Sequence, residues 1–560
     1  MPGTPYRQIV LSAVPTLLSS QDRDPASPTF GCFDRQYWAW ANKDFANADL
    51  QRGVYILARL YRWQDDDNPY FDNEHVRSWI EAGIEFLCRI QHGNGAFDQW
   101  YPLERSVGTT GFVTGPVVDA LELLGDDMSG ALRSRACEML RRAGRLLLTQ
   151  GEGHGFISNH QAGAALSLYR LYELLGDDRY KDRSSELIDA VARHQSEEGW
   201  FCEYDGADPG YETLGIAYLA SLWQRSGNPR LFEMLQRSVD FLRYFIHPNG
   251  TLGGEYGSRS TELYYPSGIE ALAPRCAEAR SIATDLRQRV GQGRLTDVAN
   301  CDVPNFVPLL SSYVSAMIDA THLEPAPSLP CAAEPFTRHF VKAGLYVRKT
   351  TSYYSVVGLS KGGTLRLHDS QGGNCIHIDA GLVALSDRGP ERSTQILEHD
   401  RRCTVTDTIL SVDAPFYVCS GWRRMTPVDF TGLRLFTHSI GRWGALGEWL
   451  KRFLARRLIS GRKRTDLTLT RTIEFQQECV TVKDRIEGTG HGIAWIQRGV
   501  KFCAVFMGSA RYFSVQELEI QAPPPDRVSW NGKTPTSTEY VVERRDGVWL
   551  MRAPIDAGES

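Results

Sequence analysis

Apolar residues recur at intervals of three and four through the first part of the chain, up to about residue 320. Clear examples are Glu74–Ile90, Ser129–Leu148 and Asn228–Phe245, in which Arg and Glu occupy the opposite side of the period. This spacing is typical of amphipathic helices that pack by one face against a core. The pattern therefore predicts a helical N-terminal region.

A similar sequence motif separates these predicted helices. It consists of the end of a helix, a turn that contains glycine, and then an aromatic or apolar residue. Its four copies are anchored at Gln91, Gln150, Gln195 and Pro248, which lie 59, 45 and 53 residues apart. This period fits one helical hairpin per repeat, and a ring of such hairpins is an (α/α) toroid. The aromatic and charged content of the loops favours a toroid with a site at one end over an ordinary helical array.

Beyond a Pro-rich segment, Thr321–Pro335, the helical period gives way to short runs rich in Val, Ile and Thr that are separated by turns. Such runs over about 210 residues predict an antiparallel β-sandwich. We expect an (α/α) toroid catalytic domain at 1–325, a Pro-rich linker at 326–344 and a β-sandwich domain at 345–560.

One stretch, 441–465, interrupts the β pattern with a basic amphipathic helix. Apolar Trp, Leu and Phe residues lie on one side of its period and Lys and Arg on the other. Two interpretations fit this pattern. It is an insertion packed on the sandwich, or it makes a peripheral contact with a membrane or an anionic polymer.

Composition and charge narrow the class of protein. At 560 residues the chain exceeds the roughly 250–300 residues at which single cores stop growing. The formal net charge of −5 argues against a nucleic-acid partner. Twelve cysteines without paired spacing argue against a disulfide framework and fit a reducing compartment. The N-terminal segment is a poor signal peptide, so we expect a cytoplasmic or inner-membrane-associated protein.

Three short motifs carry the candidate chemistry. Asn159 and His160 stand at the start of one predicted helix, and Tyr211 follows Gly210 at the start of another about fifty residues later. The third motif is the run from His377 to Leu385 at the start of the sandwich. In order and spacing these motifs resemble the heparinase II/III-type polysaccharide lyases and their alginate-lyase relatives. Taken singly, Asn159 could be a helix cap and Tyr211 a core aromatic.

The resemblance implies cleavage of a uronate-containing acidic polysaccharide by β-elimination, with no cofactor required. That reaction removes the proton next to a carboxylate, so the site must neutralise the carboxylate, which an amide and an imidazole can do. A tyrosine can take the proton and return it to the leaving oxygen if cations lower its pKa. In the resembling family, these roles fall on the residues that match Asn159, His160 and Tyr211.

The sandwich is expected to complete the catalytic set through His377. The family pattern often reads His-x-His-x-Asp, whereas this chain has Cys375 at the first position. Either His377 takes the role, or His368 or Asn374 does, or the role is absent. His377, Asp387 and His399 are of types that bind zinc, but their spacing matches no zinc signature, so we predict no metal site.

Substrate-binding residues are expected in the loops. The loop 250–268 contributes Glu255, Tyr256 and Arg259, of which Arg259 could grip a carboxylate or sulfate with its guanidinium fork. An earlier loop adds Trp100 and Arg105, the aromatic and basic types that a sugar cleft needs.

Four functions remain open at this level. The first is a polysaccharide lyase, possibly in an exopolysaccharide system. A uronyl C5-epimerase would form the same intermediate on a related fold. A glycoside hydrolase needs a pair of carboxylates, which is not evident in the pattern. A non-catalytic glycan-binding or assembly protein is the fourth.

Overall fold

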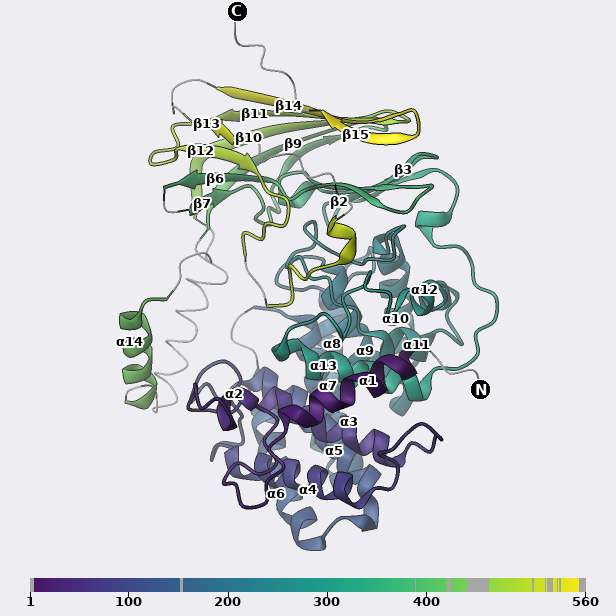
Figure 1. The fold of residues 1–560 in the computed structure, drawn as a ribbon, viewed down its shortest axis with the longest axis vertical. Coiled ribbons are helices and arrows are strands. Elements are labelled where there is room, and N and C mark those ends of the chain that lie inside the picture. The colour runs from purple at the N-terminus through teal and green to yellow at the C-terminus, as the bar shows by residue number, and fades with distance from the viewer. Residues whose placement is uncertain are drawn as a thin grey trace, which may run out of the picture.

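The computed structural model describes residues 5–151, 155–387, 389–419, 425–439, 441, 463–505, 508–518, 520, 527–530, 532 and 535–552. In Figure 1 the helices form one body and the strands lie above it as stacked sheets. The helical domain contains α1 (Tyr6–Ser20), α2 (Arg35–Trp38), α3 (Gly53–Arg62), α4 (Glu74–Ile90), α5 (Val107–Leu124), α6 (Gly130–Thr149), α7 (Ser158–Leu175), α8 (Asp178–His194), α9 (Pro209–Ser226), α10 (Pro229–Leu242), α11 (Pro266–Leu272), α12 (Ala277–Arg289) and α13 (Val303–Asp319).

The helices form a closed ring. Helices α3, α5, α7, α9, α11 and α13 pack each against the next, and α13 returns to α3. The helices between them in sequence, among them α4, α6, α8, α10 and α12, pack outside this inner ring. The expected (α/α) toroid is therefore confirmed, with the loops before the inner helices gathered at one end.

The glycine-containing motif that recurs between the helices in the sequence forms a similar turn in the structure. After α4 and after α8, a glutamine donates its side-chain amide to a glycine carbonyl, Gln91 to Gly95 (3.0 Å) and Gln195 to Gly199 (2.7 Å). The φ angles of Gly95 and Gly199 are 91° and 105°. A Cβ at either position would lie 2.2 Å from a carbonyl oxygen of the next outer helix. Only glycine fits both the conformation and the space.

The C-terminal domain is an antiparallel β-sandwich, as predicted. A five-stranded sheet has the order β1-β2-β3-β4-β5, and a ten-stranded sheet has the order β13-β12-β6-β7-β9-β10-β11-β14-β15, with β8 paired to β9. The strands are β1 (Phe336–Phe340), β2 (Leu345–Lys349), β3 (Tyr353–Gly358), β4 (Thr364–Asp369), β5 (Cys375–Asp379), β6 (Leu382–Ser386), β7 (Gly389–Ser393), β8 (Arg402–Val405), β9 (Ile409–Val418), β10 (Arg464–Phe475), β11 (Cys479–Glu487), β12 (Trp495–Arg498), β13 (Arg527–Ser529), β14 (Thr536–Arg545) and β15 (Val548–Arg552).

The core of the sandwich lies between its two sheets. Leu367 of β4 packs in one apolar cluster with Val482 of β11 and Val542 of β14. Buried and exposed positions alternate along β10, which is the period of two expected of a strand with one face on a core. Strand β1 begins at Phe336, so the first sheet starts inside the segment predicted as a linker.

The two domains meet through a buried polar contact. Arg366 of β4 donates to Glu255 at 2.7 Å and to Glu262 at 3.1 Å, both in the loop before α11. His368, two residues further along β4, stacks on His247 of the helical domain with ring centroids 4.6 Å apart. Burial holds the pKa of both imidazoles well below the usual range. The sandwich is thus fixed to the same end of the toroid at which the inner-helix loops gather.

Helix α14 (Pro427–His438) lies below the level of the sandwich, beside the helical body and on the same side as α2 in Figure 1. Its Arg434 pairs with Asp44 at 2.7 Å. Of the predicted basic helix at 441–465, only 441 and 463–465 belong to the described residues, and Arg464 and Thr465 lie in β10. The predicted membrane or polymer contact falls outside the described residues.

Candidate active site at the start of helices α7 and α9

Asn159 lies in the first turn of α7 and is held by a buried carboxylate. Its side-chain amide donates to Glu203 Oε2 at 2.7 Å, and its backbone N–H donates to Oε1 at 2.8 Å. Glu203 belongs to the loop before α9, is fully buried, and has a pKa raised well above its usual range by burial. The helix cap is Ile157, so Asn159 is not the N-cap that its type suggested.

Tyr211 lies in the first turn of α9, where Asp208 fixes it. Asp208 caps the helix by accepting the Tyr211 N–H at 3.1 Å, and its other oxygen accepts the Arg259 N–H at 2.8 Å. One carboxylate therefore sets the backbone of both residues. Burial raises the pKa of Tyr211 to about 12, Asp208 and Glu203 act in the same direction, and Arg259 lowers it.

His160 is half-buried in a cluster that extends from Asn159 toward α5 and η1 (Ala48–Arg52). Its ring meets Phe112 edge-on at 5.0 Å, and Phe112 stacks on Tyr218 at 5.5 Å. Arg52 donates to the Tyr218 hydroxyl at 3.0 Å. Burial raises the pKa of the Asp49 carboxyl, whereas Arg52 and His160 act to lower it, so these three groups lie close together. The cluster places an imidazole and a guanidinium beside the two helix starts.

Arg259 is a cation that acts on the pKa of Tyr211. Its guanidinium lies over the ring of Tyr204, 4.0 Å from the centroid, and Tyr204 in turn contacts Tyr211 with ring centroids 6.5 Å apart. The backbone here is left-handed at three non-glycine residues, Tyr204 (φ 55°), Asp205 (φ 71°) and Ser260 (φ 58°). Such conformations cost free energy and cluster at functional sites.

The sandwich contributes a hydroxyl to the same place. Ser509 Oγ donates to Tyr211 Oη at 2.9 Å and lies 3.2 Å from Thr261 Oγ1. A second sandwich residue, Lys361, reaches into the loop behind Arg259, where its Nζ donates to Gly257 O at 2.7 Å and to Ser260 Oγ at 3.1 Å. Burial lowers the pKa of Lys361 to about 8.

His377 lies elsewhere, which differs from the prediction. It pairs with Leu367 across β4 and β5 and faces the interior of the sandwich, where its Nε2 lies 3.2 Å from the hydroxyl of Tyr540. Burial lowers its pKa to about 4. Each residue along a strand turns to the opposite face, so His377 and the domain contact made by Arg366 lie on opposite sides of the sheet. The structure does not bring His377 to Tyr211.

Glu255 and Tyr256 also differ from their predicted role. Both are buried at the domain contact. The Glu255 carboxylate accepts hydrogen bonds from Arg366, and the Tyr256 hydroxyl lies 2.8 Å from His247 Nε2. A side chain whose polar atoms are engaged by protein has little capacity left for a sugar. These two residues join the domains.

Trp100 and Arg105 lie in the loop that leads into α5. The Trp100 side chain is 60% exposed, and its backbone N–H donates to Glu104 at 2.7 Å. Arg105 is half-buried with φ of 52°, and its N–H donates to Asp98 at 2.8 Å. Both stay candidates for contact with a sugar chain.

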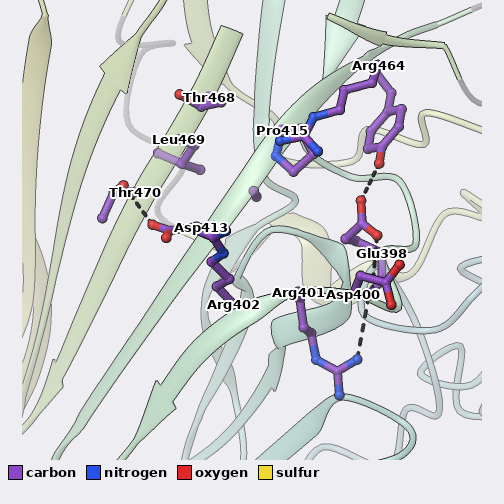
Figure 2. A pocket seen from close by; sticks show the side chains of 12 residues that line it. Glu398, Asp400, Arg401, Arg402, Asp413, Pro415, Arg464, Thr468, Leu469 and Thr470 are labelled. Carbon is purple, nitrogen blue, oxygen red and sulfur yellow. Dashed lines mark hydrogen bonds between the residues drawn. The ribbon is translucent and has the colours of Figure 1, made fainter. Parts of the chain in front are cut away.

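A cavity of about 590 Å³ in the sandwich holds none of the predicted residues. Figure 2 shows part of this lining, in which the Thr470 hydroxyl donates a hydrogen bond to Asp413. Glu398 accepts a hydrogen bond from the Tyr417 hydroxyl. Its guanidiniums and carboxylates balance, since it is lined by Arg401, Arg402, Arg464, Glu398, Asp400 and Asp413. This balance gives the cavity no net attraction for an anionic chain.

Two features of the described residues bear on the predicted zinc site and membrane contact. Within the described ranges, no three His, Cys, Asp or Glu side chains gather as a metal site would require. His377, the first of the candidate zinc ligands, is instead bonded to Tyr540. In the part of the chain that the structure describes, no helix has the length and apolar content needed to cross a membrane.

Sequence reasoning missed three residues of this site: Glu203, Asp208 and Ser509. Asp208 carried a usable signal, because Asp before Pro209 is a typical start of a helix. Glu203 and Ser509 carried none, since each acts through a partner more than forty residues away along the chain.

The chain combines an (α/α) toroid with an antiparallel sandwich, and solved polysaccharide lyases have the same fold. Residues 48–268 match the family model of the ulvan lyase N-terminal domain, which relates the helical domain to polysaccharide lyases. The resemblance to polysaccharide lyases inferred from the motifs is thereby confirmed. No curated protein sequence matches the chain.

Solved structures show the same fold. A xanthan lyase from Paenibacillus has a TM-score of 0.53 at 10% identity, over 89% of this chain and 46% of that one. A chondroitin AC lyase from Streptomyces coelicolor A3, in complex with chondroitin sulphate, has a TM-score of 0.51 at 11% identity, over 88% and 67%. The chain thus spans less than half the length of that xanthan lyase.

Proposed function

We propose that this chain cleaves a uronate-containing acidic polysaccharide by β-elimination. The observation that carries the proposal is that the starts of α7 and α9 share Glu203, which accepts from the Asn159 amide and acts, together with Arg259, on the pKa of Tyr211. The match of residues 48–268 to a lyase domain supports the same reaction class.

Neutralisation of the substrate carboxylate falls to Asn159, His160 and Arg259. Asn159 has an amide oriented by Glu203, Arg259 supplies a guanidinium, and His160 supplies a ring nitrogen. The starts of α7 and α9 add the positive ends of two helix dipoles. Together these groups would stabilise the second negative charge that develops when the neighbouring carbon loses its proton.

Proton transfer falls to Tyr211. As phenolate it takes the proton from the carbon next to the carboxylate. The electron pair of that C–H bond forms the new carbon–carbon double bond, and the bond to the glycosidic oxygen breaks. Tyr211 then returns the proton to that oxygen. Burial opposes the phenolate by raising the pKa of Tyr211, whereas the Ser509 hydroxyl and Arg259 favour it.

The test is a set of incubations with alginate, polygalacturonate, chondroitin sulfate, heparin, xanthan and ulvan, with neutral dextran as the control. A lyase product carries an unsaturated uronate, so we expect its ultraviolet absorbance to rise with at least one acidic polymer and not with dextran. Absence of a rise with every polymer would contradict the proposal. The same incubations in D₂O report the C5-epimerase alternative, which would place deuterium in the polymer without a rise in absorbance.

A further inference from the structure

The sandwich segment 508–512 is built against the reactive end of Tyr211. Ala510 forms an antiparallel bridge with Thr261, and the Tyr512 hydroxyl donates to Asp302 at 2.9 Å and accepts from Asn305 at 2.8 Å. Ser509, Ala510 and Tyr512 are all buried. On the other side of Ser509, Asn305 also donates to Gly508 O at 3.1 Å, so the segment is fixed on the helical domain on both sides of Ser509.

Ser509 Oγ lies within hydrogen-bond distance of two other hydroxyl oxygens, those of Tyr211 and Thr261. Ser509 has one hydroxyl proton, and it points to Tyr211 Oη at 2.9 Å. Since that proton is used, the 3.2 Å contact between Ser509 Oγ and Thr261 Oγ1 requires Thr261 to donate. Thr261 thus donates to Ser509, and Ser509 donates to the phenol oxygen of Tyr211. In such a chain each hydrogen bond polarises the next hydroxyl and strengthens it as a donor.

We propose that Ser509 is a positioning residue for Tyr211, through which the sandwich supplies the hydrogen bond that holds the phenol oxygen and favours its deprotonated form. The inference rests on the proposed function, because it assigns the sandwich part of the same site. The sequence suggested His377 as the residue that the sandwich adds to the site, and this inference assigns that part to Ser509.

The other groups around Tyr211 do not replace this hydroxyl. The Asp208 and Glu203 carboxylates disfavour the phenolate, and Tyr265 is a second buried phenol. Arg259 acts on Tyr211 by charge from its position over the Tyr204 ring. Lys361 donates to Gly257 and Ser260, behind the Arg259 loop. Among the described residues, Ser509 is the side chain that donates a hydrogen bond to Tyr211 Oη.

The test uses the full chain with 3,5-difluorotyrosine at position 211, because fluorination brings titration of the phenol into a range where proteins stay folded. Fluorine NMR then follows that residue alone without substrate. We expect Ser509→Ala to raise the pKa of the labelled phenol by about one unit, since a hydrogen bond to the charged form is lost. Ser509→Thr keeps a hydroxyl and should leave the pKa within about 0.3 unit.

The matched control is Ser514→Ala, which removes a hydroxyl bonded to Arg294 in the same stretch of chain. An unchanged pKa in Ser509→Ala, or an equal rise in Ser514→Ala, would overturn the inference. A second measurement on the unlabelled protein uses a polymer that it cleaves: Ser509→Ala should lower kcat about tenfold with little change in KM. Absence of cleavage by the unmodified protein would contradict the proposed function, while the titration would still decide the role of Ser509.

Discussion

Burial and the neighbouring groups shift the pKa of Tyr211 in opposite directions. Burial raises its pKa to about 12, and Arg259 and the Ser509 hydroxyl act against burial. At neutral pH the phenol therefore keeps its proton. A tyrosine in this state carries a proton that it can donate, and it accepts one only in the small fraction of molecules that are phenolate.

This balance predicts how activity depends on pH. If Tyr211 is the base, the reactive fraction is the phenolate, which grows about tenfold per pH unit below the pKa. We expect kcat to rise steadily from neutral to alkaline pH for as long as the protein stays folded. The measurement is initial rates of unsaturated-product formation in matched ionic strength, with circular dichroism at each pH. A rate that stays level through this range would show that Tyr211 acts only as the acid, since a phenol with a pKa of about 12 keeps its proton here, and that another group takes the proton from carbon.

Helix α9 is anchored by a buried carboxylate in its first turn. Glu212 is fully buried and accepts from the Phe201 N–H at 3.0 Å and from Ser238 Oγ at 2.6 Å. Burial raises its pKa from 4.5 to about 8. The contact ties the loop before α9 and the outer helix α10 to the turn that carries Tyr211.

The raised pKa of Glu212 makes stability depend on pH. Between about pH 4.5 and 8 the folded state binds a proton that the unfolded state has lost, so stability falls as pH rises through this window. Glu212→Gln keeps an acceptor for both donors and removes the titration. We expect the melting temperature of the variant to fall less between pH 5 and pH 8 than that of the unmodified protein, by differential scanning fluorimetry.

The control for this experiment is Glu233→Gln, at an exposed position on α10. It should keep the full fall in melting temperature. An equally steep fall in Glu212→Gln would mean that Glu212 is ionised in the folded protein and does not set the dependence.

At the scale of the whole molecule, the site exists because two domains meet. Arg366 contacts Glu255 and Glu262 from β4, and Ser509 contacts Tyr211 from the loop that follows β12. Both contacts are buried and polar, so they need defined partners to offset desolvation. The position of the sandwich therefore sets the environment of Tyr211.

Removal of the Arg366 guanidinium tests this coupling. Arg366→Met would leave two buried carboxylates with one cation fewer, which costs about 3–5 kcal/mol in the free energy of unfolding. Urea unfolding measures the loss. Arg485→Ala is the matched control, because Arg485 pairs with Glu487 on an exposed surface, and it should cost less than about 1 kcal/mol. An Arg366→Met loss as small as that of the control would contradict the account of the domain contact.

The sequence was sufficient for the toroid and the sandwich, because period, turn glycines and β-rich runs are local signals. It also singled out Asn159, His160 and Tyr211, which lie in the first turns of the neighbouring inner helices α7 and α9 and whose catalytic roles stay a prediction. It could not orient His377, since β5 is covered on both faces and lacks the alternation that separates them. Ser509 was beyond reach because its partner lies on another domain, and irregular backbone has no period from which to predict direction.

The most direct measurement is the rate of unsaturated-uronate formation by Tyr211→Phe, compared with the unmodified protein on the polymer that it cleaves. Phe keeps the ring and removes the oxygen that exchanges the proton. Tyr169→Phe is the control, since Tyr169 is a half-buried phenol that packs on Tyr172. We predict a loss of kcat of about 10³-fold or more for Tyr211→Phe and no more than a twofold change for Tyr169→Phe. Cleavage by Tyr211→Phe at the rate of the control would contradict the central claim that Tyr211 transfers the proton.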